Sequence, residues 1–348
     1  MAKLISADLT NNKLCILEYT TTDGQMLSFN EDAFDAKIMS HTYTDIGKVI
    51  FDKPITRIGE KAFMYCHSLT SVTIPNSVTT IGEDAFSDCS SLTSVTIPDS
   101  VTTIGEGAFS SCESLTSVTI PNSVTTIGEW TFSDCRSLTS VTIPNSVTTI
   151  GKGAFSSCES LTSVTIPDSV TTIGERAFDD CSSLKEFKGK FAADGGRCLI
   201  IDGVLNAFAI DCGVTQYIIP NSVTTIGEKA FMYCDSLTSV TISNSVTTIG
   251  KDAFSDCSSL TSVTIPDSVT TIGDRAFLGC DSLTSVTIGN GVSEIGMAAF
   301  KGCNIDTIVC CPKIPPKIDD SFGKFKNLIV PTGCEEAYAN SDWGQYLE

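Results

Sequence analysis

The chain of 348 residues contains 41 Asp and Glu against 22 Lys and Arg, which gives it a formal net charge of −19. A protein that binds DNA or RNA needs a basic surface to displace counterions from phosphates, so this balance excludes nucleic acid and anionic lipid as partners. No run of about 18 apolar residues exists, which excludes a transmembrane helix and membrane insertion.

Residues 1–45 precede the regular part of the sequence and are predicted to form an N-terminal cap. Lys13–Tyr19 and Gln25–Phe29 flank a Thr-Thr-Asp-Gly turn, which indicates a β-hairpin. A stacked array needs such a cap because its first coil otherwise exposes an apolar side and an unpaired strand edge. The first residues contain no apolar signal-peptide core, so we expect either a cytoplasmic protein or a chain that begins after a removed leader.

From residue 46 to residue 310 the sequence repeats a 23-residue unit, of which residues 68–90 are one copy. A period of that length predicts a solenoid, in which each unit covers the apolar side of its neighbour. The first apolar position of a Leu-x-x-Val-x-Ile strand marks twelve rungs, at Ile46, Leu69, Leu92, Leu115, Leu138, Leu161, Leu184, Val214, Leu237, Leu260, Leu283 and Ile305. The rung at residues 184–213 is irregular, with 30 residues instead of 23.

Each unit contains a strand and a second inward-facing segment. In one copy the predicted inward positions are Leu69, Val72, Ile74, Val78, Ile81, Ala85, Phe86 and Cys89. The last three have the spacing of short helical turns, on the side of the coil opposite the strand. Ser71 and Thr73 alternate with inward residues of the strand, so they are predicted to point outward. Pro75 ends the strand because it has no N–H for a ladder hydrogen bond.

The cysteines follow the repeat and do not suggest a disulfide framework. Ten of the 16 recur at one point of the coil, at Cys66, Cys89, Cys112, Cys135, Cys158, Cys181, Cys234, Cys257, Cys280 and Cys303. We expect a ladder of buried thiols, because free cysteine packs as a small hydrophobe. No CxxC pair indicates zinc. Disulfides remain open for the other six, Cys15, Cys198, Cys212, Cys310, Cys311 and Cys334.

Residues 311–348 depart from the repeat and are predicted to form a C-terminal cap. Three prolines, Pro312, Pro315 and Pro316, end the regular pattern. Residues 327–331 are predicted to form a last edge strand, and residues 334–343 a closing helix. Tyr338 and Trp343 would then cover the last coil.

The pattern Leu-x-x-Val-x-Ile-Pro-x-Ser-Val-x-x-Ile-Gly-x-x-Ala-Phe-x-x-Cys resembles that of the BspA-like bacterial leucine-rich repeat proteins. The likeness covers roughly residues 46–310, and the closing Val-Pro-Thr-Gly-Cys-Glu-Glu-Ala-Tyr is also similar to that family's ends. The resemblance implies a leucine-rich repeat solenoid, a right-handed coil with a parallel sheet on one face, short helical turns on the other and capped ends. It also implies adhesion or protein binding at a bacterial surface, and it brings no catalytic residues.

The sequence offers no catalytic constellation, and we expect neither enzymatic activity nor a cofactor. The only histidines are His41 and His67, and His67 occupies a slot that holds Ser, Glu, Arg or Asp in other coils. No Ser-His-Asp, Cys-His or metal-ligand cluster can be assembled around either. Glutamates recur on successive coils from Glu60 to Glu129, which leaves calcium bridging open, although no Asp-x-Asp-x-Gly loop supports it.

The central excursion, residues 185–218, is the first candidate for a binding site. It replaces outward Ser and Thr by other side chains, and binding residues concentrate on loops that a rigid scaffold holds. Its candidate contact residues are Glu186, Phe187, Lys188, Lys190, Arg197, Gln216 and Tyr217. Ile218 takes the next outward position after Gln216. The alternative is a tolerated insertion with no role in binding.

Two further candidate surfaces lie within the regular coils. Trp130 occupies a slot that otherwise holds small or charged residues, and an exposed tryptophan is a frequent interface anchor, although it can also lie flat over neighbouring side chains. The outward serines and threonines predict two columns of hydroxyls that could suit a protein or a glycan. They include Ser140, Thr142, Ser163 and Thr165. The alternative is a solvated face left by duplication.

We therefore expect a non-enzymatic repeat protein that binds a protein, or possibly a glycan, through a rigid solenoid surface at the cell surface or after secretion. The alternative is a structural spacer or a subunit of a larger assembly, such as a phage tail or injection apparatus. The partner and the oligomeric state do not follow from the sequence.

Overall fold

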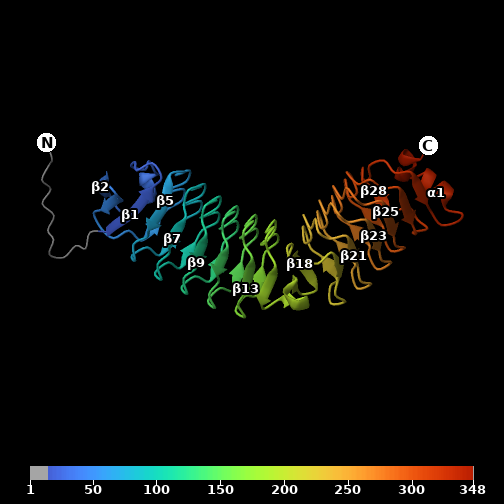
Figure 1. The fold of residues 1–348 in the computed structure, drawn as a ribbon, viewed down its shortest axis with the longest axis horizontal. Coiled ribbons are helices and arrows are strands. Elements are labelled where there is room, and N and C mark those ends of the chain that lie inside the picture. Colours follow the sequence, from blue (N-terminus) through green and yellow to red (C-terminus); the bar gives the residue numbers. More distant parts are fainter. Residues whose placement is uncertain (1–14, 348) are drawn as a thin grey trace. The chain divides into compact units, whose positions relative to one another are not determined.

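A computed structural model describes residues 15–347, which form a parallel β-solenoid (Figure 1). The described chain divides into two compact units, and each is treated by itself. Unit 1 contains residues up to Leu161 together with Pro167–Ala177, and unit 2 contains Thr162–Ile166 and the chain from Phe178 onward. The predicted fold class is confirmed.

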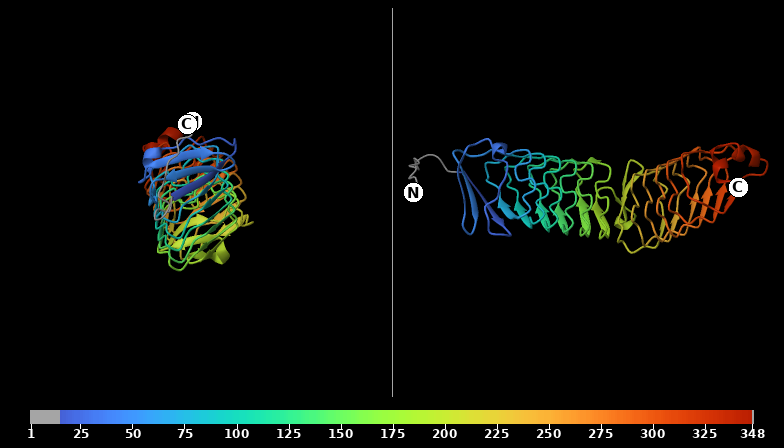
Figure 2. Two further views of the ribbon diagram at one scale, coloured as in Figure 1. Left: turned by 90° about the vertical axis from the view of Figure 1, so that its left-hand side faces the viewer. Right: turned by 90° about the horizontal axis from the view of Figure 1, so that it is seen from above.

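One coil shows why the repeat produces this fold. Strand β5 (Leu69–Thr73) lies on one side, which we call the front, and β6 (Thr80–Ile81) lies on the back. The same residues recur 23 positions later, so Ser71 pairs with Ser94 in the front ladder and Thr80 with Thr103 in the back ladder. Successive coils therefore stack in parallel register, as the right-hand view in Figure 2 shows within each unit.

The strands of both units are short. In unit 1 the front strands are β5, β7 (Ser94–Thr96), β9 (Ser117–Thr119) and β11 (Ser140–Thr142), and the back strands are β4 (Arg57–Ile58), β6, β8 (Thr103–Ile104), β10 (Thr126–Ile127), β12 (Thr149–Ile150) and β14 (Thr172–Ile173). In unit 2 the front strands are β13 (Ser163–Ile166), β15 (Glu186–Gly189), β19 (Gln216–Ile218), β21 (Ser239–Thr241), β23 (Ser262–Ile265), β25 (Ser285–Ile288), β27 (Thr307–Cys310) and β29 (Asn327–Ile329). Its back strands are β18 (Val204–Phe208), β20 (Thr225–Ile226), β22 (Thr248–Ile249), β24 (Thr271–Ile272), β26 (Glu294–Ile295) and β28 (Lys317–Ile318).

A column of phenylalanines fills the centre of each unit, as predicted for Phe86. Neighbouring rings lie nearly parallel, with centroids 5.1–5.6 Å apart from Phe63 to Phe155. From Phe231 to Phe322 the corresponding distances are 4.8–5.1 Å. The stack follows from the repeat, because one phenylalanine per coil occupies the same buried position.

The segment predicted to form short helical turns is a series of tight turns instead. Each copy places two residues in the left-handed region, such as Asp84 with φ 51° and Asp88 with φ 58°. A right-handed helix cannot continue through such residues. The inward residues Ala85, Phe86 and Cys89 are nonetheless buried as expected.

The N-terminal cap is built differently from the predicted hairpin. Strand β1 (Cys15–Thr21) pairs antiparallel with β5 on one side and with β3 (Gly47–Phe51) on the other. The hairpin is formed by β2 (Ile38–Tyr43) and β3, and residues 25–29 form no strand. A short 3-10 turn, η1 (Glu31–Ala33), lies between β1 and β2, and positions 13 and 14 of the predicted first strand lie outside the described residues. Because β1 covers the edge of β5, the segment still caps the first front strand.

The C-terminal cap agrees with its prediction and adds part of a coil. Strand β29 is the expected edge strand, and α1 (Glu335–Ala339) with η3 (Asp342–Tyr346) forms the closing helical segment. Tyr338 and Trp343 are buried against the end of the array. The coil pattern continues past residue 310, since β28 extends the back ladder and Phe322 extends the ring stack.

Candidate functional site

The central excursion lies within unit 2 and begins as a normal coil. Strand β15 pairs in parallel register with β13, and the chain then turns at Gly189, which has φ 81°. It forms β16 (Ala192–Ala193), η2 (Asp194–Gly196) and the antiparallel pair of β17 (Cys198–Ile201) with β18, which is a short hairpin. Strand β18 then takes the back-ladder position beside β20, so the repeat resumes in phase.

The excursion interrupts the front ladder of unit 2. Strand β15 pairs only with β13, and β19 is the edge strand of a separate six-stranded sheet. On the β15 side, η2 occupies the vacant edge, and Gly196 approaches so closely that a Cβ there would lie 2.6 Å from the Phe187 carbonyl oxygen. The chain thus covers one of the two edges that the break creates.

The edge of β19 carries backbone groups that have no partner in the described protein. The Ile219 N–H donates to the Thr241 carbonyl oxygen on β21, at 3.0 Å. Alternate residues of a parallel strand bond to opposite neighbours, so the N–H and C=O of Gln216 and Ile218 point away from β21. Among residues 15–347 no hydrogen bond engages these four groups.

Exposed side chains flank this edge. Ile218 is 71% exposed, in the column where other coils carry threonine. Gln216 is also exposed, while Glu186 and Lys188 form an ion pair at 2.6 Å on the outward face of β15. Ile218 is an exposed apolar residue that the predicted contact set omits, and the signal for it was an apolar side chain in a threonine slot.

Two predicted contact residues are wrong, because they lie in the core. Phe187 and Tyr217 are 1% and 4% exposed. Both occupy the inward valine position, since Phe187 pairs with Val164 and Tyr217 with Val240. Burial raises the pKa of the Tyr217 hydroxyl, which lies 3.4 Å from the Cys198 thiol.

The remaining charges of the excursion are largely satisfied. Arg197 donates to the Asp194 carbonyl oxygen at 3.2 Å and pairs with the Asp194 carboxylate at 3.4 Å. The Lys190 ammonium lies 5.0 Å from the centroid of the Phe191 ring. Both cations therefore support the turn between β15 and β17. The feature that distinguishes the excursion from the regular coils is the open edge of β19 with the exposed Ile218.

Trp130 lies flat along unit 1, as its alternative interpretation predicted. Its ring occupies the space above Gly153, where a Cβ would lie 2.1 Å from the indole. The guanidinium carbon of Arg176 lies 5.3 Å from the ring centroid, an arrangement typical of a cation–π contact. These residues occupy the same slot in successive coils. The indole thus fills a gap that glycine leaves, and it is partly buried.

The outward hydroxyls form the predicted columns within each unit. In unit 1, Ser140 and Thr142 stand beside Ser117 and Thr119 on β9. In unit 2, Ser163 and Thr165 stand beside Glu186 and Lys188, at the start of the excursion.

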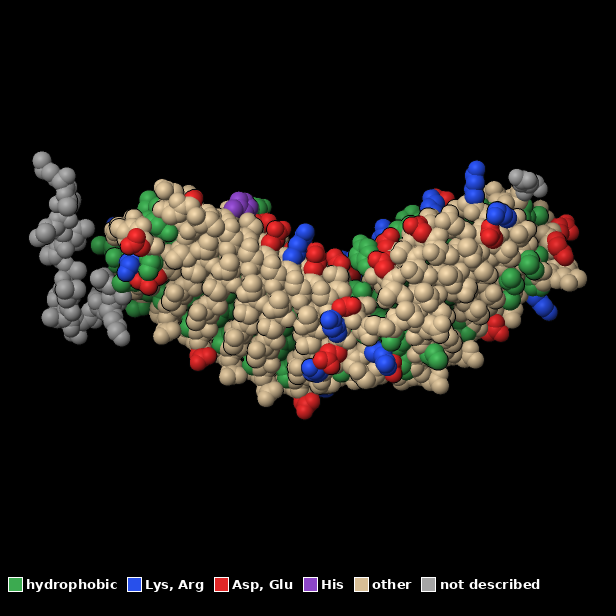
Figure 3. Space-filling view, viewed as in Figure 1, with side chains coloured by type: hydrophobic (Ala, Val, Ile, Leu, Met, Phe, Trp, Pro, Cys, Tyr) green, Lys and Arg blue, Asp and Glu red, His purple; other side chains and the backbone are tan. Residues whose placement is uncertain are grey.

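Uncharged polar side chains and backbone cover much of the face visible in Figure 3 in each unit. A depression of about 490 Å³ opens along the front of unit 2, and its lining includes Thr264, Asn244 and Asp267.

Comparison with known proteins identifies the family to which this solenoid belongs. A model of the BspA type leucine rich repeat region matches six copies, over residues 56–185 and 205–328. The chain belongs to the BspA-type leucine-rich repeat family. Between them the two matched ranges leave out residues 186–204, which lie within the excursion.

Solved structures resemble the BspA-type chain over most of its length. A leucine rich cell surface protein of Faecalibacterium prausnitzii A2-165 is 28% identical, with a TM-score of 0.60 over 94% of this chain and 97% of its own. The pneumococcal vaccine antigen PcpA shares the fold at 20% identity and a TM-score of 0.69, over 91% and 96%. A leucine-rich repeat protein of Eubacterium ventriosum gives 24% and 0.57, over 80% and 70%. No curated protein matches the chain.

The BspA-type repeat keeps its ladder thiols buried. All ten ladder cysteines are buried, and no disulfide forms among residues 15–347. Ladder thiols donate to the carbonyl oxygen of the phenylalanine 26 residues earlier, for example from Cys112 to Phe86 at 3.2 Å. Burial raises the pKa of Cys66 to about 11 and that of Cys135 to about 12. A protonated, enclosed thiol is a packing group and not a nucleophile.

The described part of this BspA-type chain brings no three potential metal-ligating side chains together. His67 is exposed, whereas the His41 Nε2 lies 2.6 Å from the Tyr19 hydroxyl, and burial lowers the pKa of His41. In the column of glutamates, Glu60 pairs with Lys61 at 2.8 Å. Among residues 15–347 no helix is long and apolar enough to cross a bilayer.

Proposed function

We propose that this BspA-type protein is a non-catalytic binding module of a bacterial cell surface, and that it engages a protein partner at the break in the front ladder of unit 2. The family and the likeness to a protein described as a leucine rich cell surface protein support the location. The open edge of β19 supports the site.

The single observation that carries the proposal is the set of unpaired N–H and C=O groups on Gln216 and Ile218. An exposed strand edge accepts an extended peptide, whose main-chain groups complete the ladder and give affinity. Ile218, exposed beside these groups, would pack against an apolar side chain of the added strand. Three edge residues provide few hydrogen bonds, so specificity would also need side-chain contacts along the flanking hydroxyl columns.

The test replaces outward residues of β19 by those of the regular repeat and leaves the rest of the excursion in place. We expect Ile218→Thr combined with Gln216→Ser to weaken capture of a cross-linked surface partner strongly, because the apolar contact of Ile218 is lost and both residues then match Ser239 and Thr241 of the next coil. The matched control is Ile329→Thr, which removes another exposed isoleucine, 52% exposed, from the distant strand β29. Capture that the first pair of substitutions leaves unchanged, or that falls equally in the control, would contradict the proposal.

A structural role in a larger assembly is the second candidate, and the edge strand β29 favours it. This strand ends the six-stranded sheet and presents Ile329. If the ends make the functional contacts, Ile329→Thr should prevent assembly while the substitutions in β19 leave it unchanged. Light scattering and cross-linking of full-length protein separate the two outcomes. Binding to a polysaccharide instead of a protein would assign the hydroxyl columns to glycan contact.

A further inference from the structure

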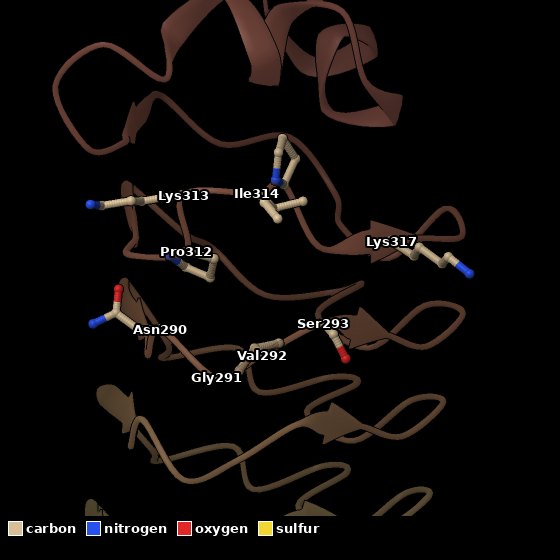
Figure 4. Close-up of a pocket in the computed structure, with 9 residues that line it drawn as sticks. Asn290, Gly291, Val292, Ser293, Pro312, Lys313, Ile314 and Lys317 are labelled. Atoms are coloured by element: carbon tan, nitrogen blue, oxygen red, sulfur yellow. The ribbon is translucent and has the colours of Figure 1, made fainter.

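A groove of about 810 Å³ opens at the C-terminal end of unit 2, away from the central excursion (Figure 4). It lies where the chain passes from the front strand to the back strand in two successive coils. The lower turn contributes Asn290, Gly291 and Val292, and the upper turn contributes Lys313 and Ile314.

The groove exists because these two turns depart from the repeat. In most regular coils a serine in this turn donates to a valine carbonyl of the previous coil, as Ser245 does to Val223 at 2.7 Å, whereas the Ser268 hydroxyl makes no such bond. The corresponding positions hold Gly291 and Ile314, which have no hydroxyl to donate. In the lower turn the Val292 N–H donates to the Gly289 carbonyl oxygen at 3.2 Å. Pro315 takes the position of this valine in the upper turn, and because proline has no N–H the upper turn cannot form the same bond. The upper turn therefore lacks both bonds that tie the turns of regular coils, and the lower turn lacks the serine bond.

The upper turn is nevertheless held firmly by the C-terminal cap. The Tyr338 hydroxyl donates to the Pro312 carbonyl oxygen at 2.7 Å, and the Trp343 indole N–H donates to the Pro316 carbonyl oxygen at 2.9 Å. Both aromatic side chains are buried. Ile314 lies between these two anchored prolines and is 83% exposed. The backbone that carries Ile314 is therefore preorganised, because little of its conformational freedom remains to be lost on binding.

Two lysines mark the ends of the groove. Figure 4 shows the side chains of Lys313 and Lys317 extending in opposite directions, with Ile314 between them. Neither lysine forms an ion pair within residues 15–347, although Glu294 is the strand neighbour of Lys317. On a chain with a net charge of −19, this groove combines an apolar centre with two lysines that form no ion pair, although Glu294, Asp319 and Asp342 line the neighbouring hollow beside Lys317.

We propose that this groove binds an extended peptide of a partner protein with the pattern acidic-x-aliphatic-x-acidic. In an extended chain the side chains at i, i+2 and i+4 point to the same face, and they span about 13 Å at 3.3 Å per residue. The central aliphatic side chain packs against Ile314 and the half-buried Pro315, and the two carboxylates pair with Lys313 and Lys317. The site is independent of the edge of β19, so either can fail without the other.

Fluorescence anisotropy with labelled synthetic peptides and the full chain tests this site. The probe is Glu-Ser-Leu-Ser-Glu, and the comparison peptides are Lys-Ser-Leu-Ser-Lys and Glu-Ser-Ser-Ser-Glu. We expect the probe to bind with a Kd of about 0.1–1 mM, in the range of weak peptide contacts, and each comparison peptide at least tenfold more weakly. Affinity for the probe should fall several-fold between 50 and 500 mM salt, because exposed charge pairs are screened.

Substitutions that restore repeat residues test the same contacts from the protein side. Ile314→Ser and the pair Lys313→Asn with Lys317→Thr should each weaken binding of the probe at least tenfold. Ile329→Ser and Lys324→Asn are the matched controls, because they remove an exposed isoleucine and an exposed lysine outside the groove. Each variant must keep the melting curve of the parent protein. No binding of the probe at 5 mM, equal binding of the lysine peptide, or an equal loss in the controls would overturn the proposal.

Discussion

Removal of one ring from the phenylalanine column should destabilise unit 2 locally and strongly. Phe254 is fully buried, and its ring centroid lies 4.8 Å from that of Phe231 and 5.0 Å from that of Phe277. A buried Phe→Ala substitution costs about 3–5 kcal/mol through lost transfer energy and cavity formation. Because Phe254 also loses contacts with two stacked rings, each worth about 0.5–1.5 kcal/mol, we expect the upper part of that range, about 4–5 kcal/mol.

Hydrogen exchange is the appropriate assay because a solenoid can open coil by coil. A loss of about 4 kcal/mol corresponds to roughly a thousandfold faster exchange of amides protected by local opening. The acceleration should be confined to the coil of Phe254 and its neighbours, including the Cys257 amide, which donates to the Phe254 carbonyl oxygen at 3.3 Å.

Phe191→Ala provides the matched control, because Phe191 is partly exposed and outside the stack. Its effect should stay below about 1 kcal/mol, as for surface substitutions. Equal acceleration in both variants, or uniform acceleration over both units, would refute the reasoning from nearest-neighbour packing.

Three further predictions concern the thiols, the tryptophan and the cap. Burial raises the pKa of Cys66 to about 11 and that of Cys135 to about 12, so the folded state keeps thiol protons that the unfolded chain loses near pH 9. The melting temperature should therefore fall between pH 9 and 11. Iodoacetamide at pH 8 should label these thiols only after denaturation. An unchanged melting temperature over that interval would contradict this. Gly153→Ala should destabilise by about 1–3 kcal/mol through overpacking against Trp130, and by less when combined with Trp130→Gly, as urea denaturation of all four proteins would measure. Trp343→Ala should cost about 3–5 kcal/mol locally and accelerate amide exchange at the C-terminal end, while exchange in unit 1 stays unchanged.

Periodicity made much of this fold predictable. A position that repeats every 23 residues must meet its own copies, so the inward Phe86 and Cys89 columns and the outward Ser71 and Thr73 columns follow directly from the spacing. The same reasoning shows why Phe187 was misplaced: its slot holds valine in other coils, and the repeat register alone indicates burial. The predicted helical turns are tight turns instead, because Asp84 and Asp88 adopt left-handed backbone conformations. The residue types at these positions do not distinguish a helical turn from such a tight turn.

The structures of the two caps and of the central excursion could be known only from the tertiary structure. The sequence by itself determined a stacked BspA-type solenoid with buried thiols, because identical units can bury their apolar residues only against one another. Only the folded structure decided that β1 inserts between β3 and β5, that η2 covers the edge of β15 while β19 stays open, and that Tyr338 and Trp343 fix the turn that carries Ile314. These features arise from pairings between unlike segments, for which no repeat spacing sets the register.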